Sequence, residues 1–169
     1  MRYKKRFCIW VICAISCGCQ NRNAHTNVGQ ILYKLPVNWL KQSKHYNGIN
    51  VVFFNQQTLK EKYTENIIIT KINGQSLKDV SENYIQDIRR KNVLFNLLKR
   101  TDINTISYSG IIEDFKVRKR NVDIGCTVLF IKFNDGDIYM ISHAGLNDLK
   151  GSYALQRNKF MDILDNNLN

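Results

Sequence analysis

The stretch from Asn104 to Ser142 restricts the possible folds more than any other, because it holds three apolar segments joined by very short connections. These segments span 104–117, 122–133 and 137–142. Such short connections join antiparallel neighbours, whereas parallel strands need a crossover of about a dozen residues or more. Asn134-Asp135-Gly136 is also a hairpin turn sequence, which we favour here over a calcium loop. We therefore predict an antiparallel meander.

Shorter strands and one periodic segment precede the meander. Strands are predicted at 30–35, 49–54 and 66–72. A helix is predicted to begin after Ser76, a favourable N-cap residue. Apolar residues then recur at helical spacing, at Leu77, Val80, Tyr84 and Ile88. This helix reaches Lys91, and its continuation through 93–100 is left open.

The segment after this helix carries Phe95, Leu97 and Leu98. Packing on the sheet is the favoured interpretation, and a partner-binding surface is the alternative. A terminal helix is predicted at 149–168. Because strands and helices do not alternate, the predicted class is α+β, with a central and a C-terminal helix packed on an antiparallel sheet.

The N-terminus has the features of a secretory signal. Four positive charges lie within Met1–Arg6, and a short apolar run follows at 7–15. The run has about half of the roughly 20 residues that a membrane-spanning helix needs. Small residues and Cys17 or Cys19 come next, which resembles a bacterial lipoprotein signal, and Cys17 is the favoured lipidation site.

This assignment divides the chain into three parts. Residues 1–16 are the predicted signal peptide, 17–29 a flexible polar tether, and 30–169 a single α+β domain. An ordinary cleaved signal with unmodified cysteines is the alternative. The predicted location is the periplasmic face of a bacterial membrane, in the cell envelope, held there by lipid.

The charge balance favours an anionic partner, which is an anionic membrane surface, a cell-wall polymer or an acidic protein. Lys and Arg number 25 against 14 Asp and Glu, a formal net charge of +11. Nucleic acid is not the predicted partner, since the chain is predicted to be exported and has no nucleic-acid-binding motif. The basic run 116–120 ends in Arg118, Lys119 and Arg120, which we predict to lie exposed at a hairpin tip and to bind a protein. Arg89–Lys91 and Lys99-Arg100 add further basic runs. For any one run, ordinary solvated surface is the favoured interpretation and partner binding the alternative.

No set of residues in the sequence has the spacing of a catalytic or metal site. The three histidines, His25, His45 and His143, lack helical metal-ligand spacing, so we predict no metal and no cofactor. Neighbours on a strand face opposite sides, which argues against Ser142–His143 and against Glu113–Asp114 as catalytic pairs. Cys126 is the only cysteine beyond the N-terminal region and is interpreted as a buried free thiol. We therefore predict a protein that is not an enzyme.

One segment resembles a known family. Tyr33, Pro36 and Trp39, in "YKLPVNWL", match the strand, proline and tryptophan that open the PsbP and DcrB-like fold. The resemblance spans most of 30–169 and implies an assembly, chaperone or partner-binding role rather than catalysis. Trp39 itself is expected to pack in the core.

The combined prediction is a lipid-anchored envelope protein that binds a protein partner. An immunity lipoprotein that neutralises a periplasmic toxin is one concrete form of this role. The alternatives are an envelope assembly or chaperone-like factor, and an enzyme whose residues meet only in three dimensions.

Overall fold

The computed structural model describes residues 25–28, 31–34, 39–41, 51–60, 63–73, 76–92, 94–119, 121–147 and 157–158. Its strands are β1 (His25–Val28), β2 (Ile31–Lys34), β3 (Trp39–Lys41), β4 (Val51–Asn55), β5 (Asn66–Ile72), β6 (Phe95–Asn104), β7 (Tyr108–Lys119), β8 (Val122–Phe133) and β9 (Ile138–Leu146). A short 3-10 helix, η1 (Gln56–Thr58), follows β4, and the α-helix α1 (Leu77–Lys91) follows β5.

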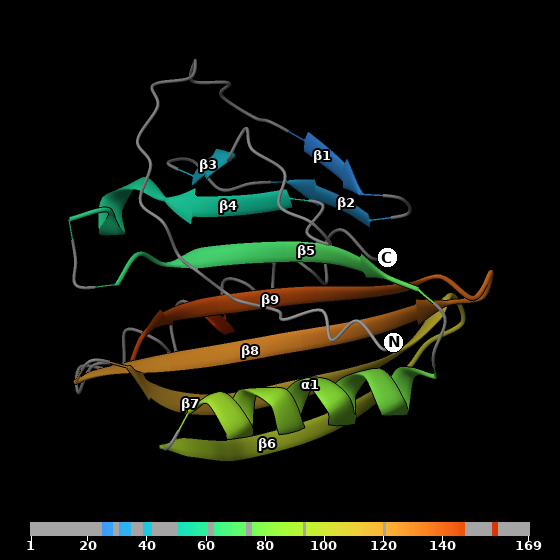
Figure 1. Ribbon diagram of the computed structural model, residues 1–169. Helices are drawn as coiled ribbons and strands as arrows, with labels where there is room; N and C mark the ends of the chain where they lie inside the picture. The colour runs from blue at the N-terminus through green and yellow to red at the C-terminus, as the bar shows by residue number, and fades with distance from the viewer. Residues whose placement is uncertain are drawn as a thin grey trace, which may run out of the picture.

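Seven of these strands form one antiparallel sheet, in the order β3-β4-β5-β9-β8-β7-β6. Figure 1 shows α1 lying across one face of this sheet, near the β6 edge. The predicted α+β class with an antiparallel sheet is confirmed. Within the described residues, β3 and β6 form the two edges of the sheet.

A separate hairpin precedes the sheet. β1 pairs antiparallel with β2, from His25 opposite Lys34 to Val28 opposite Ile31. β1 therefore lies within the segment predicted as a tether, 17–29, and the division of the chain into signal peptide, tether and domain stays a prediction.

The meander is confirmed and is longer than predicted. β8 has the bounds expected from the sequence, while the segment predicted at 104–117 divides into the end of β6, a turn at 105–107 and β7. Asn121 (φ 64°), between β7 and β8, and Gly136 (φ 93°), between β8 and β9, take the left-handed backbone conformation. Glycine and asparagine are favoured in such turns. β9 runs on to Leu146, so His143 lies inside a strand and not at its end.

α1 begins where predicted and ends at Lys91, so it does not continue through 93–100. The backbone N–H of Asp79 donates to the Ser76 hydroxyl at 3.2 Å, which caps the first turn. At the other end, the Asn92 side chain donates to the carbonyl of Ile88 at 2.8 Å. The chain then pairs with β7 as β6, so 95–104 is an edge strand and no longer helix.

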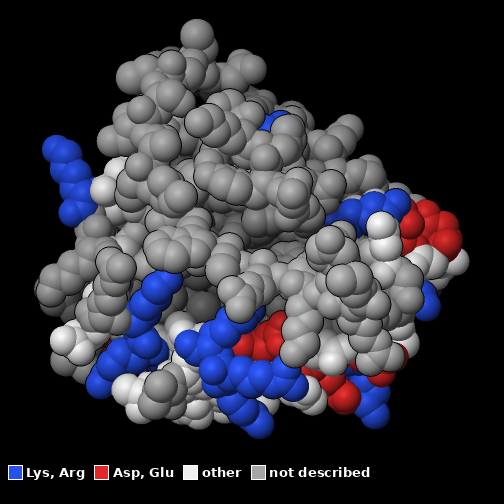
Figure 2. Space-filling view, in the orientation of Figure 1, with Lys and Arg blue, Asp and Glu red and all other residues white. Residues whose placement is uncertain are grey.

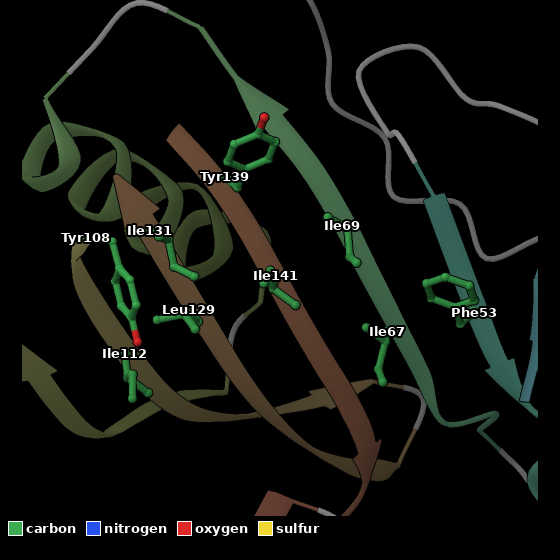
Figure 3. Packing of buried hydrophobic residues seen from close by; sticks show 9 residues of the cluster. All are labelled: Phe53, Ile67, Ile69, Tyr108, Ile112, Leu129, Ile131, Tyr139 and Ile141. Atoms are coloured by element: carbon green, nitrogen blue, oxygen red, sulfur yellow. The ribbon is translucent and has the colours of Figure 1, made fainter. Parts of the chain in front are cut away.

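The sheet has a hydrophobic cluster on each face. Val80 and Ile85 of α1 pack against residues of β7, β8 and β9 on one face, and the ring of Tyr84 meets that of Phe130 edge-on at 5.5 Å. Figure 3 shows the other cluster, on the face away from α1, with side chains contributed by β4, β5, β9, β8 and β7. Trp39 is partly buried against this second cluster, as predicted.

Several predictions fall outside the described residues. The signal peptide and both candidate lipidation sites, Cys17 and Cys19, lie in 1–24. Of the predicted terminal helix, only Arg157 and Asn158 are described, and both are helical. In the part of the chain that the structure describes, no helix has the length and apolar character needed to span a bilayer.

Candidate partner-binding surface

The tip of the β7–β8 hairpin carries the residues predicted to bind a partner. Arg118 donates to both carboxylate oxygens of Asp123, from Nε at 2.5 Å and from Nη2 at 2.8 Å. This hydrogen bonding raises the pKa of Arg118 and lowers that of Asp123. Lys119 is exposed at the end of β7, and Arg120 lies outside the described residues. Arg118 and Lys119 are exposed as predicted, and the charge of Arg118 is balanced by Asp123 across the hairpin.

The structure brings three basic runs that are separate in the sequence to the side of the sheet formed by α1, β6 and β7. Arg89, Arg90 and Lys91 form the last turn of α1, and β6 begins four residues later. The backbone N–H of Arg118 donates to the carbonyl of Leu94 at 3.2 Å, which places the end of β7 beside the start of β6. Lys99 and Arg100 follow on β6 itself.

Four of these basic side chains have no acidic partner among the described residues. Arg90 lies 3.4 Å from Asp87, and Arg100 lies 3.4 Å from Glu113. Arg89 instead stacks over the ring of Phe95, with its guanidinium carbon 5.3 Å from the ring centroid. The four side chains are Arg89, Lys99, Lys116 and Lys119. Arg89, Lys99 and Lys119 are exposed, whereas Lys116 is half-buried and its charge acts on the carboxylate of Asp123 without a salt bridge.

Exposed leucines lie among these cations. Leu94, Leu97 and Leu98 expose 56%, 38% and 47% of their surface. Figure 2 shows Lys and Arg side chains gathered over the lower part of this face, where Figure 1 places α1 and β6. We call the basic edge the last turn of α1 (Arg89–Lys91), residues 94–100 at and within β6, and residues 116–119 at the end of β7. Mixed cationic and apolar exposure of this kind is typical of a protein-binding surface.

Glu113 and Asp114 face opposite sides of the sheet, as predicted. Glu113 accepts from the Ser81 hydroxyl on α1 at 2.8 Å, while Asp114 accepts from Thr127 at 2.6 Å and from two nitrogens of Arg157. Burial raises the pKa of Glu113, although Ser81 and Arg100 act in the opposite direction. Each carboxylate thus has a structural contact on its own face.

A buried carboxylate–imidazole pair is the feature that sequence reasoning missed. Nε2 of His143 lies 2.8 Å from Oε1 of Glu65, and the Asn55 amide donates to Oε2 at 2.6 Å. The two residues are 78 positions apart, so no local motif reveals them. Ser142 lies on the opposite face of β9 from His143, and both His143 and Glu65 are closed to solvent. The pair therefore lacks access for a substrate, and among the described residues no group of three potential metal ligands occurs.

Cys126 is a free thiol in β8 and packs against the cluster under α1. Burial raises the pKa of this thiol to about 12. Since the thiolate is the nucleophilic form, the raised pKa of Cys126 disfavours reaction at neutral pH. The residue is half-buried, so the predicted burial is found only in part.

Comparison with known proteins supplies the fold. No model of a known protein family matches the chain, and no curated protein matches its sequence. Among solved structures, the Ran-binding protein Mog1p of Saccharomyces cerevisiae has a TM-score of 0.60 over 89% of this chain and 95% of its own, at 10% identity. PsbP (CyanoP) of Synechocystis has a TM-score of 0.56 over 90% and 95%, at 12% identity. The fold is PsbP-like.

The PsbP-like fold confirms the resemblance stated from the sequence. LpqN, involved in cell envelope biogenesis in Mycobacterium tuberculosis, has a TM-score of 0.55 over 86% of this chain and 83% of its own, at 12% identity. Likeness at these identities shows the PsbP-like fold alone, because one fold hosts unrelated functions. Within this fold, the basic edge is the feature of this chain that bears on partner binding.

Proposed function

We propose that this chain is a non-enzymatic, lipid-anchored envelope protein that binds an acidic protein partner through the basic edge. The observation that carries the proposal is the meeting of three basic runs around exposed leucines along the β6 edge of the sheet. Apolar side chains supply contact area, while unbalanced cations steer and orient an acidic partner.

Two of the similar structures support a role in protein binding or in the cell envelope. One is described as Ran-binding and another as involved in cell envelope biogenesis. The closed Glu65–His143 pair favours binding over catalysis, because a reacting group needs contact with its substrate. The basic and apolar N-terminus supports export and lipidation.

An immunity lipoprotein that neutralises a periplasmic toxin is the more specific form of this proposal. Its motivation is a small domain with a predicted anchor and a strongly basic balance. Co-expression with the secreted product of a neighbouring gene tests it. Restored growth supports the immunity role, whereas unrelieved toxicity, or no such neighbour, favours an envelope assembly or chaperone-like factor.

The binding proposal is tested with charge reversals of equal size at two places. Lys99→Glu with Lys119→Glu alters the basic edge, while Lys41→Glu with Lys60→Glu alters exposed lysines elsewhere, one of them on the opposite edge strand β3. The full chain is tagged and its partner captured from its own host, and association rates are then measured at two salt concentrations.

We expect the first double variant to bind more slowly and the second to bind as the wild type does. The wild-type rate should also fall with added salt, because the Debye length is only about 10 Å at 0.1 M. An association rate that ignores both salt and the Lys99/Lys119 reversal would show that the basic edge is ordinary solvated surface.

A further inference from the structure

In the part of the chain that the structure describes, β6 pairs on one side only, with β7, and its other side offers backbone hydrogen-bonding groups at known positions. In an antiparallel ladder, residues alternate between those bonded to the neighbouring strand and those whose N–H and C=O point away from it. Leu94 accepts from Arg118, so its carbonyl points toward β7. Phe95 and Leu97, one and three positions later, therefore direct their N–H and C=O groups away from β7.

The same alternation holds at the other end of the strand. The N–H of Thr105 donates to the carbonyl of Tyr108, which makes Asp102, opposite Ile111, another outward-facing position. The register shifts between Leu97 and Lys99, leaving Leu98 as the extra residue of a bulge. The bulge thus divides β6 into two halves.

Only one of these halves carries the usual protection of an edge strand. Natural edges are guarded by charged side chains, and the second half has Lys99, Arg100 and Asp102. From Leu94 to Leu98 there is no charge, and all three leucines are exposed. An unguarded, apolar edge is a template for pairing with another strand.

The positive charges around this stretch of β6 favour an acidic segment over a second copy of the same edge. Arg89 lies over Phe95, Lys116 is opposite Asn96, and Lys99 and Lys119 are exposed at the two ends of this stretch. A second copy of the same edge would bring these cations against one another, which is unfavourable. An acidic segment would instead place its carboxylates beside them.

We infer that β6, between Leu94 and Leu98, takes up an extended acidic segment of the partner protein as an additional strand of the sheet. The inference rests on the proposed function and specifies how that partner is held. Main-chain hydrogen bonds to Phe95 and Leu97 supply affinity, the exposed leucines contact alternate apolar side chains, and the cations select for acidity.

Proline substitution separates this mode from simple charge attraction, because proline removes one N–H and is tolerated where that N–H faces away from the ladder. Leu97→Pro removes an outward donor in the apolar half, and Asp102→Pro removes one in the guarded half. The probe is a short fluorescent peptide of alternating glutamate and valine, titrated into the full chain, with a lysine–valine peptide of equal length for comparison.

The wild type and Asp102→Pro should bind the acidic peptide alike, and Leu97→Pro should bind it about tenfold or more weakly. Addition of the peptide should also slow hydrogen exchange of the Phe95 and Leu97 amides and leave that of Asp102 unchanged. This exchange measurement on the wild type decides the matter if Leu97→Pro does not fold.

Equal binding of the two peptides, or no protection at Phe95 and Leu97, would overturn the inference. A concentration-dependent dimer that Leu97→Pro abolishes would overturn it in favour of self-pairing. If the host partner binds the wild type and Leu97→Pro equally, the edge-strand mode fails while the proposed function stands. If the peptide pairs with β6 but the charge reversals leave partner association unchanged, the proposed function fails separately.

Discussion

Glu65 and His143 meet at 2.8 Å beneath the surface of the sheet, one just before β5 and the other inside β9. The Asn55 amide holds the second carboxylate oxygen. Asn55, Glu65 and His143 thus tie β4, the start of β5 and β9 together from one face. Three elements of the sheet depend on a polar contact that is shielded from water.

Replacing Glu65 by leucine should destabilise the domain. A buried group left without its hydrogen-bond partner costs about 1–3 kcal/mol, and this change deprives both Asn55 and His143. Urea denaturation of the wild type, Glu65→Leu and the surface control Glu82→Leu would measure the free energies of unfolding. Equal losses for the two variants would show that the buried contact has no special weight.

Trp39→Ala should lower stability without affecting a binding site. Truncation of a buried tryptophan costs about 3–5 kcal/mol, and because Trp39 is only partly buried we expect the lower end of this range. The matched control is Ile106→Ala, since Ile106 is 97% exposed and should change stability by about 0.5 kcal/mol or less. A melting temperature of Trp39→Ala equal to that of the wild type would contradict the packing role.

The raised pKa of Glu113 predicts a pH dependence of stability. The folded state binds this proton more tightly than the unfolded state, so the contribution is fully present below the ordinary value of 4.5 and is lost as pH rises through the folded pKa. The variant Glu113→Gln does not titrate here and should gain stability relative to the wild type across this window. Thermal melts at a series of pH values would measure the difference.

Asp123→Asn serves as a control for Glu113→Gln, because the pKa of Asp123 is shifted in the opposite direction. In the wild type, the hydrogen bonds that Arg118 donates to Asp123 lower the pKa of Asp123 below 3.8. The stability that it contributes is therefore present above 3.8 and is lost as pH falls through the lowered pKa. A constant difference between Glu113→Gln and the wild type at all pH values would refute the assignment for Glu113.

Replacing the lipidated cysteine should move the protein from the membrane to the soluble periplasmic fraction. Cys17→Ser, Cys19→Ser and the double variant, fractionated separately, identify the modified residue, which we expect to be Cys17. Membrane association that survives the double variant would rule out a lipid anchor at either position.

Much of the fold could be predicted, because the relevant signals are local. Ser76 and the apolar spacing after it set the start of α1, and Asn134-Asp135-Gly136 set the turn before β9. β6 could not be assigned, since its sequence "FNLLKRTDIN" has no period-two alternation. An edge strand packs only in part against the core, and its pairing with β7 supplies what its own pattern lacks.

The sequence by itself determined the class of fold, the order of its main elements and the basic character of the chain. Only the tertiary structure decided which charges act together. Asp123 balances Arg118, while Arg89, Lys99 and Lys119 are exposed around an apolar edge and make no salt bridge with any described residue. Periodicity and turns depend on neighbours within a few residues, whereas charge pairing and exposure depend on distances between side chains that the sheet brings together across the chain.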